Sequence, residues 1–322
     1  MKLLLILYFL HQVSCLNLPK IWTQVSLPFK NKARDWFIGR AETLGIEWTD
    51  ITSYYQKPEI YSQLIANKID LDNVNLQYPS YYTKPFHGYD SGNLNWLAAQ
   101  EAVPATLNIA AGYWPNASIE DTQLWLRKNT TQVVNDYYFA YKNSEEYVLY
   151  PSKILDIGCS IGISTEYFQK EFPKAKFWGL DLSSYFLAVA KFRSDTKNLN
   201  ITYVHNNAEN INFDNDFFSL ITCNFLFHEL PLNASMNILK EIYRTLEPNG
   251  VISITDIEPE IINKKENNIL TPFRRWMFEI TEPHIYSYYE NNMKDLLLEI
   301  GFTNIVKARN DPVNSVWIAQ KI

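Results

Sequence analysis

Residues 154–164 read ILDIGCSIGIS and combine an acid with two glycines. Asp156 lies near the end of an apolar run, and Gly158 and Gly162 follow it. Because glycine has no Cβ, the backbone at these positions can approach a ligand closely and adopt a positive φ angle. A second acid, Asp181, ends the next apolar run nineteen residues after Gly162, and a carboxylate there can accept both hydroxyls of a ribose. The spacing indicates a nucleoside ligand.

Two kinds of nucleoside cofactor could bind at this site, a dinucleotide or S-adenosylmethionine. A dinucleotide favours the pattern G-x-G-x-x-G, whereas Ser160 and Ile163 stand at the second and third glycine positions. The carboxylate of Asp156 would also repel a pyrophosphate, while it would attract a cation. S-adenosylmethionine has an ammonium group, a sulfonium and a ribose but no phosphate. The loop therefore favours S-adenosylmethionine over a dinucleotide.

The strands of a parallel sheet would bring Asp156 and Asp181 close together. From residue 150 onward, short apolar runs alternate with amphipathic segments, which indicates βαβ crossovers and a sheet covered on both faces. Ligands of such sheets bind outside the carboxyl ends of the strands, where Asp156 and Asp181 lie. The predicted strands are Lys153–Ile157, Lys176–Asp181, Ile201–His205, Phe217–Asn224 and Gly250–Asp256, and the predicted helices are Ser164–Phe172, Ser184–Ser194 and Asn233–Leu246.

The end of the chain predicts an antiparallel sheet edge. A helix is expected over Tyr289–Ile300, followed by strands over Thr303–Arg309 and Val313–Ala319. The connection between these strands is short, which favours a hairpin over a crossover. The predicted fold class is α/β: a Rossmann-like, doubly wound, seven-stranded sheet with a C-terminal antiparallel hairpin, plus an N-terminal helical cap.

The first half of the chain predicts that cap. Between residues 28 and 150, apolar residues recur every three to four positions, which is typical of helices. We expect Pro104 to kink or split one helix, and the Pro, Gly and Ser content of residues 78–96 predicts a loop. The chain is therefore divided into a cap over 16–149 and an α/β domain over 150–322. The expected cap helices are Arg34–Leu44, Glu59–Lys68, Asn93–Ala111 and Asp121–Tyr141.

Residues 1–15 predict a secretory signal peptide, because their apolar run is too short to span a bilayer and small residues follow it. No acid occurs before Asp35, and an acid-poor, basic tract to about residue 34 resembles the two-part leader that directs proteins to plastids through the secretory pathway. The alternative destination is the ER lumen or secretion. After cleavage only Cys159 and Cys223 remain, which favours a reducing compartment. Four glycosylation sequons are present, at Asn116, Asn129, Asn200 and Asn233.

Composition narrows the range of partners. The chain of 322 residues carries a formal charge of −6, which argues against a nucleic-acid binder. Its apolar fraction of 47% and charged fraction of 20% are those of a soluble globular protein, without an integral membrane span. The histidines and cysteines of the mature chain show no metal-ligand spacing, so no metal is expected. Composition does not predict the oligomeric state.

The second half of the chain resembles the class I S-adenosylmethionine-dependent methyltransferases, in particular their type 11 group. Asp156, Gly158, Ser160 and Gly162 occupy the places of an acid-x-Gly-x-Gly-x-Gly motif, with serine for the middle glycine. The segments GLDLS, HNNAENINF, NFLFHELP and LEPNGVISITDIEP follow in the order of the family's later motifs. The resemblance covers about residues 150–322, and the front half is similar to methyltransferase-like proteins of algal and plant plastids.

This resemblance implies S-adenosylmethionine as the cofactor. Asp181 would bind the ribose, and Asn207 would meet the adenine amino group, although an asparagine in a turn needs no ligand to explain it. The full set implied for cofactor binding is Asp156, Gly158, Cys159, Ser160, Gly162, Asp181, Leu182, Asn207, Ala208 and Asn224.

His228 and Glu229 follow the fourth predicted strand, where an acceptor would approach the methyl group. His228 could act as a general base, or this segment could be a structural turn; methyl transfer can also proceed by positioning alone. We expect the insertion 256–288 and the loop 85–96 to close the acceptor pocket. The predicted acceptor-binding residues, each of which could equally serve packing or the surface, are His87, Tyr89, Arg275 and His284.

The expected function is methyl transfer from S-adenosylmethionine to a small, partly apolar acceptor that the aromatic-rich cap encloses. A protein acceptor is the alternative within this class. From other classes, the alternatives are a nucleoside-binding module without catalysis and a nicotinamide-dependent oxidoreductase.

Overall fold

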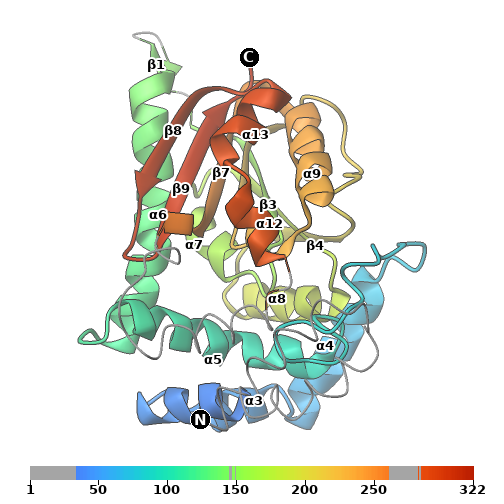
Figure 1. Ribbon diagram of the computed structural model, residues 1–322. Helices are drawn as coiled ribbons and strands as arrows, with labels where there is room; N and C mark the ends of the chain where they lie inside the picture. The colour runs from blue at the N-terminus through green and yellow to red at the C-terminus, as the bar shows by residue number, and fades with distance from the viewer. Residues whose placement is uncertain (1–33, 145–146, 149, 261–281, 283) are drawn as a thin grey trace, which may run out of the picture.

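A computed structural model of the chain describes residues 34–144, 147–148, 150–260, 282 and 284–322 (Figure 1). Its centre is a seven-stranded sheet in the order β5-β4-β3-β6-β7-β9-β8. The first five of these strands run parallel, whereas β9 is antiparallel to both β7 and β8. This arrangement confirms the predicted Rossmann-like sheet and its antiparallel edge. The strands are β3 (Lys153–Ile157), β4 (Lys176–Asp181), β5 (Ile201–His205), β6 (Phe218–Asn224), β7 (Leu246–Ile257), β8 (Thr303–Arg309) and β9 (Asn314–Gln320).

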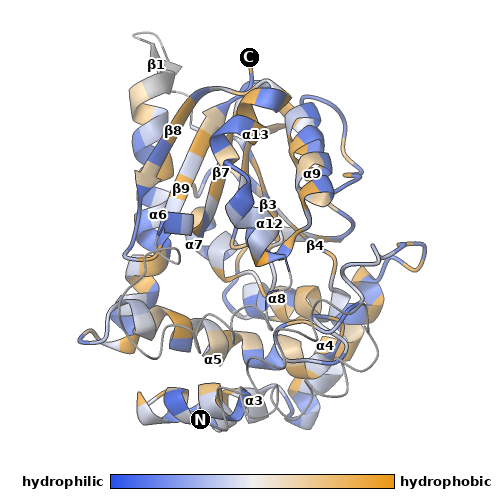
Figure 2. Ribbon diagram, viewed as in Figure 1, coloured by the Kyte–Doolittle hydropathy of each residue, from blue (hydrophilic) through white to orange (hydrophobic). Residues whose placement is uncertain are grey.

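Helices cover both faces of the sheet. The helices after residue 150 are α7 (Ile163–Glu171), α8 (Ser184–Thr196), α9 (Leu232–Thr245), α12 (Ile285–Glu290) and α13 (Met293–Ile300). Leu155 packs with α9, α12 and α13 on one face, and its neighbour Ile154 packs with α7 and α8 on the other. Successive residues of a strand point to opposite faces of the sheet. Since helices bury both faces, the strands are apolar along their length and do not alternate with polar residues. Figure 2 shows this hydrophobic content on β7 and β9.

The strand order reverses between β3 and β6. From β3 the chain builds β4 and β5 on one side, and it then returns to build β6 on the other side. The crossovers therefore diverge at the carboxyl ends of β3 and β6, and this switch point is where doubly wound sheets bind their ligands.

The front half of the described chain is helical, as predicted. A helix over 34–43 precedes α3 (Trp48–Tyr54), α4 (Pro58–Leu71), α5 (Trp96–Tyr113) and α6 (Ile119–Lys142). Apolar residues of α4 and α5 such as Leu64 and Ala99 pack against Phe186 and Val189 of α8. The cap thus lies across one end of the α/β domain, below α8 in Figure 1.

The long helix α6 joins the two parts. It begins beside α5 and runs along the sheet, where it lies next to β8 in Figure 1. Val134 and Tyr138 belong to the same buried cluster as Ile154 of β3, and the Tyr138 hydroxyl donates to the Ser219 carbonyl at 3.0 Å. One hydrophobic core therefore contains residues from both sides of position 149, the predicted end of the cap. A two-residue ladder, β1 (Asn143–Ser144) with β2 (Tyr147–Val148), follows α6.

One predicted helix differs from the structure. The single helix expected over Tyr289–Ile300 is wrong, because α12 ends at Glu290 and α13 begins at Met293. The Asn292 side chain accepts from the Lys294 amide at 3.0 Å and so caps a new helix. Pro104 lies inside α5 and does not split it. Among the described helices, none is long and apolar enough to cross a bilayer.

Candidate cofactor and acceptor site

The turn between β3 and α7 has three residues at positive φ: Gly158 at 67°, Ser160 at 51° and Gly162 at 77°. The amide of Gly158 donates to the Leu180 carbonyl at 2.8 Å, which folds the turn over the end of β4. Gly162 begins α7, and a Cβ at this residue would lie 2.6 Å from the Tyr203 hydroxyl oxygen. The turn therefore needs glycine here for both its backbone angle and its close packing.

Cys159 lies within the same turn and is 4% exposed. A Cβ on Gly179 of β4 would lie 2.9 Å from the Cys159 sulfur, so the thiol fills the space above this glycine. Burial raises the pKa of the thiol well above its usual value. Cys159 therefore packs within the loop, and its burial disfavours the thiolate form.

Two backbone amides hold the carboxylate of Asp181 in place. Its Oδ2 accepts from the Ser160 amide and its Oδ1 from the Ser183 amide, each at 2.8 Å. Burial raises the pKa of Asp181 to about 6; the two amides oppose this rise, and the charges of Glu229 and Asp156 add to it. Each oxygen keeps a lone pair, so the carboxylate can accept further hydroxyl groups. It stands at the end of β4, held in place before any ligand arrives.

Asp156 occupies a different position from the one expected of a residue that faces a cation. It is 1% exposed, and its oxygens accept from Thr165 at 2.5 Å, Thr222 at 2.9 Å and the Asn224 amide at 3.2 Å. Burial raises its pKa, and these three donors oppose the rise. Asp156 therefore ties β3, α7 and β6 together beneath the loop and fixes the orientation of Asn224.

Arg127 on α6 was missed by sequence reasoning, because no spacing links a helix of the cap to the glycine turn. Its guanidinium donates to Ser164 at 2.7 Å and to Thr106 at 2.9 Å, and it lies 5.3 Å from the ring centre of Phe225. Burial lowers the pKa of Arg127 to about 10, and the charge of Asp156 opposes this.

The Arg127 side chain also has an unused donor. The residue is 9% exposed, its buried Nε has no hydrogen-bond partner, and no carboxylate of the described residues forms an ion pair with it. A buried cation without a counterion is costly. Arg127 is therefore suited to bind an anionic group near the start of α7.

The residues after β4 and β5 complete this end of the sheet. Asn207 Oδ1 accepts from the Glu209 amide at 2.9 Å, which forms a turn, and Ala208 is 7% exposed beside it. The Leu182 carbonyl accepts from His205 Nε2 at 3.0 Å. All three predicted residues thus lie at the carboxyl end of the sheet, together with Asp181.

His205 connects this end to the cap. Its Nδ1 accepts from the Asn73 amide at 2.9 Å, so this nitrogen carries no proton. Burial lowers the pKa of His205, which also indicates a neutral ring. The Asp72 carboxylate, 3.3 Å from Nδ1, therefore does not form an ion pair with it.

His228 lies in a short 3-10 turn, Phe227–Glu229, after β6. Its Nδ1 is 2.7 Å from Asp256 Oδ1, and its amide donates to Asp256 Oδ2 at 3.2 Å. Burial alone would lower the pKa of His228, but Asp256 and two further acids raise it to about 9. The ring is an imidazolium near neutral pH, and in that state it cannot accept a proton.

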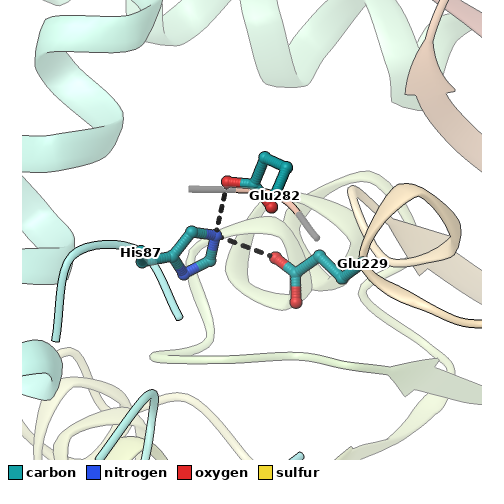
Figure 3. A group of neighbouring side chains, drawn as sticks. All are labelled: His87, Glu229 and Glu282. Carbon is teal, nitrogen blue, oxygen red and sulfur yellow. Dashed lines mark ion pairs between the residues drawn. The ribbon is translucent and has the colours of Figure 1, made fainter. Parts of the chain in front are cut away.

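His87, Glu229 and Glu282 meet in a cluster, which Figure 3 shows. His87 Nε2 lies 3.3 Å from Glu229 Oε1 and 3.2 Å from Glu282 Oε1. Burial alone would lower the pKa of His87, but the two carboxylates raise it well above its usual value. The structure thus brings together two of the predicted site residues, and it adds Glu282, which no sequence spacing could identify.

Two other predicted acceptor residues, Tyr89 and His284, have different partners. The Tyr89 hydroxyl donates to Glu101 at 2.6 Å, and Glu101 is 2% exposed, so this hydroxyl serves the interior of the cap. His284 packs edge-on against Tyr81 with ring centres 6.2 Å apart, and its buried Nε2 has no partner. Arg275, like most of the predicted insertion, lies outside the described residues.

Comparisons with known proteins concern the domain and its fold. Residues 154–250 match a family model described as a methyltransferase domain. A demethylmenaquinone methyltransferase of Geobacillus sp. (strain WCH70) is 31% identical over 96 residues, which are 29% of this chain and 40% of the relative. The chloroplastic 2-phytyl-1,4-beta-naphthoquinone methyltransferase of Arabidopsis thaliana is 26% identical over 174 residues, covering 47% of this chain and 64% of the relative.

The chain spans less than two thirds of the length of these curated relatives. Among solved structures, a putative O-methyltransferase of Nostoc punctiforme superposes with a TM-score of 0.50 at 18% identity, over 86% of this chain and 73% of the other. That likeness shows the fold. Residues 154–250 thus match a methyltransferase domain, and the chain shares the Rossmann-like fold of the Nostoc punctiforme structure.

Proposed function

We propose that the chain transfers the methyl group of S-adenosylmethionine to a small, partly apolar acceptor. The observation that carries this proposal is the position of Asp181. A carboxylate held by the amides of Ser160 and Ser183 stands at the end of β4, beside a glycine turn at the switch point of the sheet. This is a preorganised acceptor for a ribose within a matched methyltransferase domain.

The residues of the turn fit this cofactor. At Gly158, φ is 67° and a Cβ would lie 3.1 Å from the Leu226 side chain, so the turn favours glycine here. The unpartnered Nε of Arg127 is suited to the carboxylate of the methionine group, while Asp181 accepts the ribose hydroxyls. A dinucleotide fits less well, because the Ser160 amide that could bind a phosphate already donates to Asp181.

When bound, S-adenosylmethionine supplies an electrophilic methyl group for an in-line displacement. The chain's part is to hold the acceptor in line, and such positioning alone can provide much of the rate. His228 holds a proton on its ring and is a donor toward the acceptor region, with Asp256 keeping it charged. A general base is not required by this arrangement.

A small acceptor is supported by the setting of the site. Burial raises the pKa of the Tyr82 hydroxyl, and the charges of Asp181 and Glu229 raise it further. Tyr78 stacks on Tyr82 with ring centres 6.2 Å apart. Flat aromatic surfaces from the cap favour an apolar ring system, and the relatives named above are quinone methyltransferases.

Titration calorimetry with S-adenosylhomocysteine and with NAD tests the choice of cofactor. S-adenosylhomocysteine should bind with one site per chain, and NAD should not bind. The Asp181→Ala variant should lose this binding, while Asp50→Ala, which changes an exposed acid of α3, should retain it. Binding of NAD in place of S-adenosylhomocysteine would refute the proposal and favour an oxidoreductase.

We also propose that the chain acts in a plastid, reached through the two-part leader of residues 1–34. Support comes from the chloroplastic relative and from Cys159 and Cys223, which are both free and buried. The sequon residue Asn129 donates its amide to the Asn310 carbonyl at 2.8 Å, a bond that a glycan would remove. Residues 1–34 fused to a fluorescent protein should enter plastids of a host that has them; secretion of the fusion would contradict this proposal.

A further inference from the structure

The cluster of His87, Glu229 and Glu282 has the composition of a metal site. One ligand atom of each residue lies within 4.8 Å of the other two. The residues come from the cap loop, from the turn after β6 and from the segment before α12, and Figure 3 shows the His87 ring pointing between the two carboxylates. An imidazole nitrogen with two carboxylate oxygens is a common donor set for Zn²⁺ and related ions.

Glu282 provides an independent reason to expect a cation. This residue is 6% exposed, and its buried Oε2 has no hydrogen-bond partner among the residues that the structure describes. A buried carboxylate oxygen without a donor is destabilising. The single Nε2 of His87 is shared between Glu229 and Glu282, so one N–H group cannot satisfy both acids. A divalent ion would neutralise the charge of both carboxylates.

The distances also suit an ion. Zn²⁺ binds His nitrogen and carboxylate oxygen at about 2.0–2.2 Å in tetrahedral geometry, so two such ligand atoms lie roughly 3.4 Å apart. His87 Nε2 is 3.3 Å from Glu229 and 3.2 Å from Glu282. On the other side of the ring, His87 Nδ1 lies 3.4 Å from Asn93 Oδ1, so a proton on Nδ1 can point toward Asn93 when Nε2 binds an ion in place of its own proton.

We propose that His87, Glu229 and Glu282 bind one divalent transition-metal ion of the Zn²⁺ class, through His87 Nε2 and one oxygen of each carboxylate. The ion joins the cap loop to the end of β6. Three protein ligands leave a fourth coordination position open, as in catalytic zinc sites. The His87 side chain is 34% exposed, which provides a path for the ion to enter. Metal-free chain keeps a proton on His87 instead, so metal and proton compete for the same nitrogen.

The test uses the full chain after treatment with a chelator. Calorimetric titration with ZnCl2, followed by elemental analysis of the dialysed protein, should give one Zn²⁺ per chain. Co²⁺, used as a spectroscopic probe, should show the visible absorption of a tetrahedral site. Lowering the pH from 8 to 6 should weaken binding, because protons displace the metal from His87.

Variants separate this site from adventitious binding. Glu282→Gln and His87→Gln should each weaken Zn²⁺ binding at least about tenfold. His284→Gln and Glu290→Gln, which change a histidine and an acid outside the cluster, should bind as the unchanged chain does. Thermal melting of each variant establishes that it is folded. Absence of stoichiometric binding, or equal binding by the folded His87→Gln and unchanged chains, would overturn the proposal.

Discussion

Replacement of Asp181 by asparagine isolates the charge at the centre of the cofactor site. The carboxylate accepts from two amides at 2.8 Å and, in the proposed complex, from the ribose hydroxyls. Asparagine has nearly the same shape, but it has one acceptor oxygen in place of two and presents an NH2 group to one of the amides. Hydrogen bonds to a charged group contribute about 1.5–3 kcal/mol.

We therefore expect Asp181→Asn to weaken binding of S-adenosylhomocysteine about ten- to a hundredfold while the fold is kept. Calorimetry measures the affinity, and circular dichroism checks the fold. The pH dependence provides a second readout. Burial raises the pKa of Asp181 to about 6, and the ribose requires the ionised form.

Affinity should consequently be constant above about pH 6 and fall as the pH drops below this value. The Asp181→Asn variant should lose this dependence. Unchanged affinity in a folded Asp181→Asn variant would show that the ribose binds elsewhere, and the assignment of the whole turn would then be wrong.

Three further predictions follow from neighbouring residues. Arg127→Met should weaken binding of S-adenosylhomocysteine by about 1.5–3 kcal/mol but leave that of methylthioadenosine, which lacks the carboxylate, unchanged; equal losses for both ligands in calorimetry would contradict the proposed contact. Gly162→Ala should lower the free energy of unfolding by about 1–3 kcal/mol in urea, because φ is 77° and the added Cβ would lie 2.6 Å from the Tyr203 hydroxyl oxygen. His228 has a pKa of about 9 in the folded chain and about 6.5 unfolded, so its stabilisation by Asp256 is complete below pH 6.5 and is lost as the pH rises through 9. In urea, the free energy of unfolding should fall by about 1–3 kcal/mol between these two pH values, and the His228→Gln variant should show a smaller fall. Equal pH profiles for the variant and the unchanged chain would refute this prediction.

Local patterns in the sequence were sufficient for the fold. The strand predicted over Lys153–Ile157 is β3 to the residue, because a strand buried on both faces forms an uninterrupted apolar run that a turn ends. The strand predicted over Gly250–Asp256 starts too late, since β7 begins at Leu246, which pairs with Phe218 across a register shift. An irregular pairing of this kind depends on the neighbouring strand and leaves no periodic signal.

The site was predictable only where it is local. Gly158, Ser160 and Asp181 follow from motif spacing, because one turn and one strand end position them. Arg127 lies 37 residues before Ser164, its hydrogen-bond partner, and the packing of α6 on the sheet brings the two together. The cluster of His87, Glu229 and Glu282 could not be predicted for the same reason, because its residues are far apart in the sequence and only the fold brings them together.

The buried acid Asp156 shows a second limit. Its motif position was read correctly as the end of a strand, but the direction of its side chain depends on Thr165, Thr222 and Asn224. Three polar partners from α7 and β6 surround it, and a carboxylate with such donors is stable without a ligand. A motif thus places a residue along the chain but does not determine what its side chain contacts.

A crystal structure of the chain with S-adenosylhomocysteine tests the central claim most directly. The account predicts density for one ligand at the carboxyl ends of β3 and β4, with its ribose hydroxyls within hydrogen-bond distance of Asp181 and its carboxylate at Arg127. Density for the ligand away from the turn over 158–162, or a ribose without contact to Asp181 in fully occupied crystals, would contradict it.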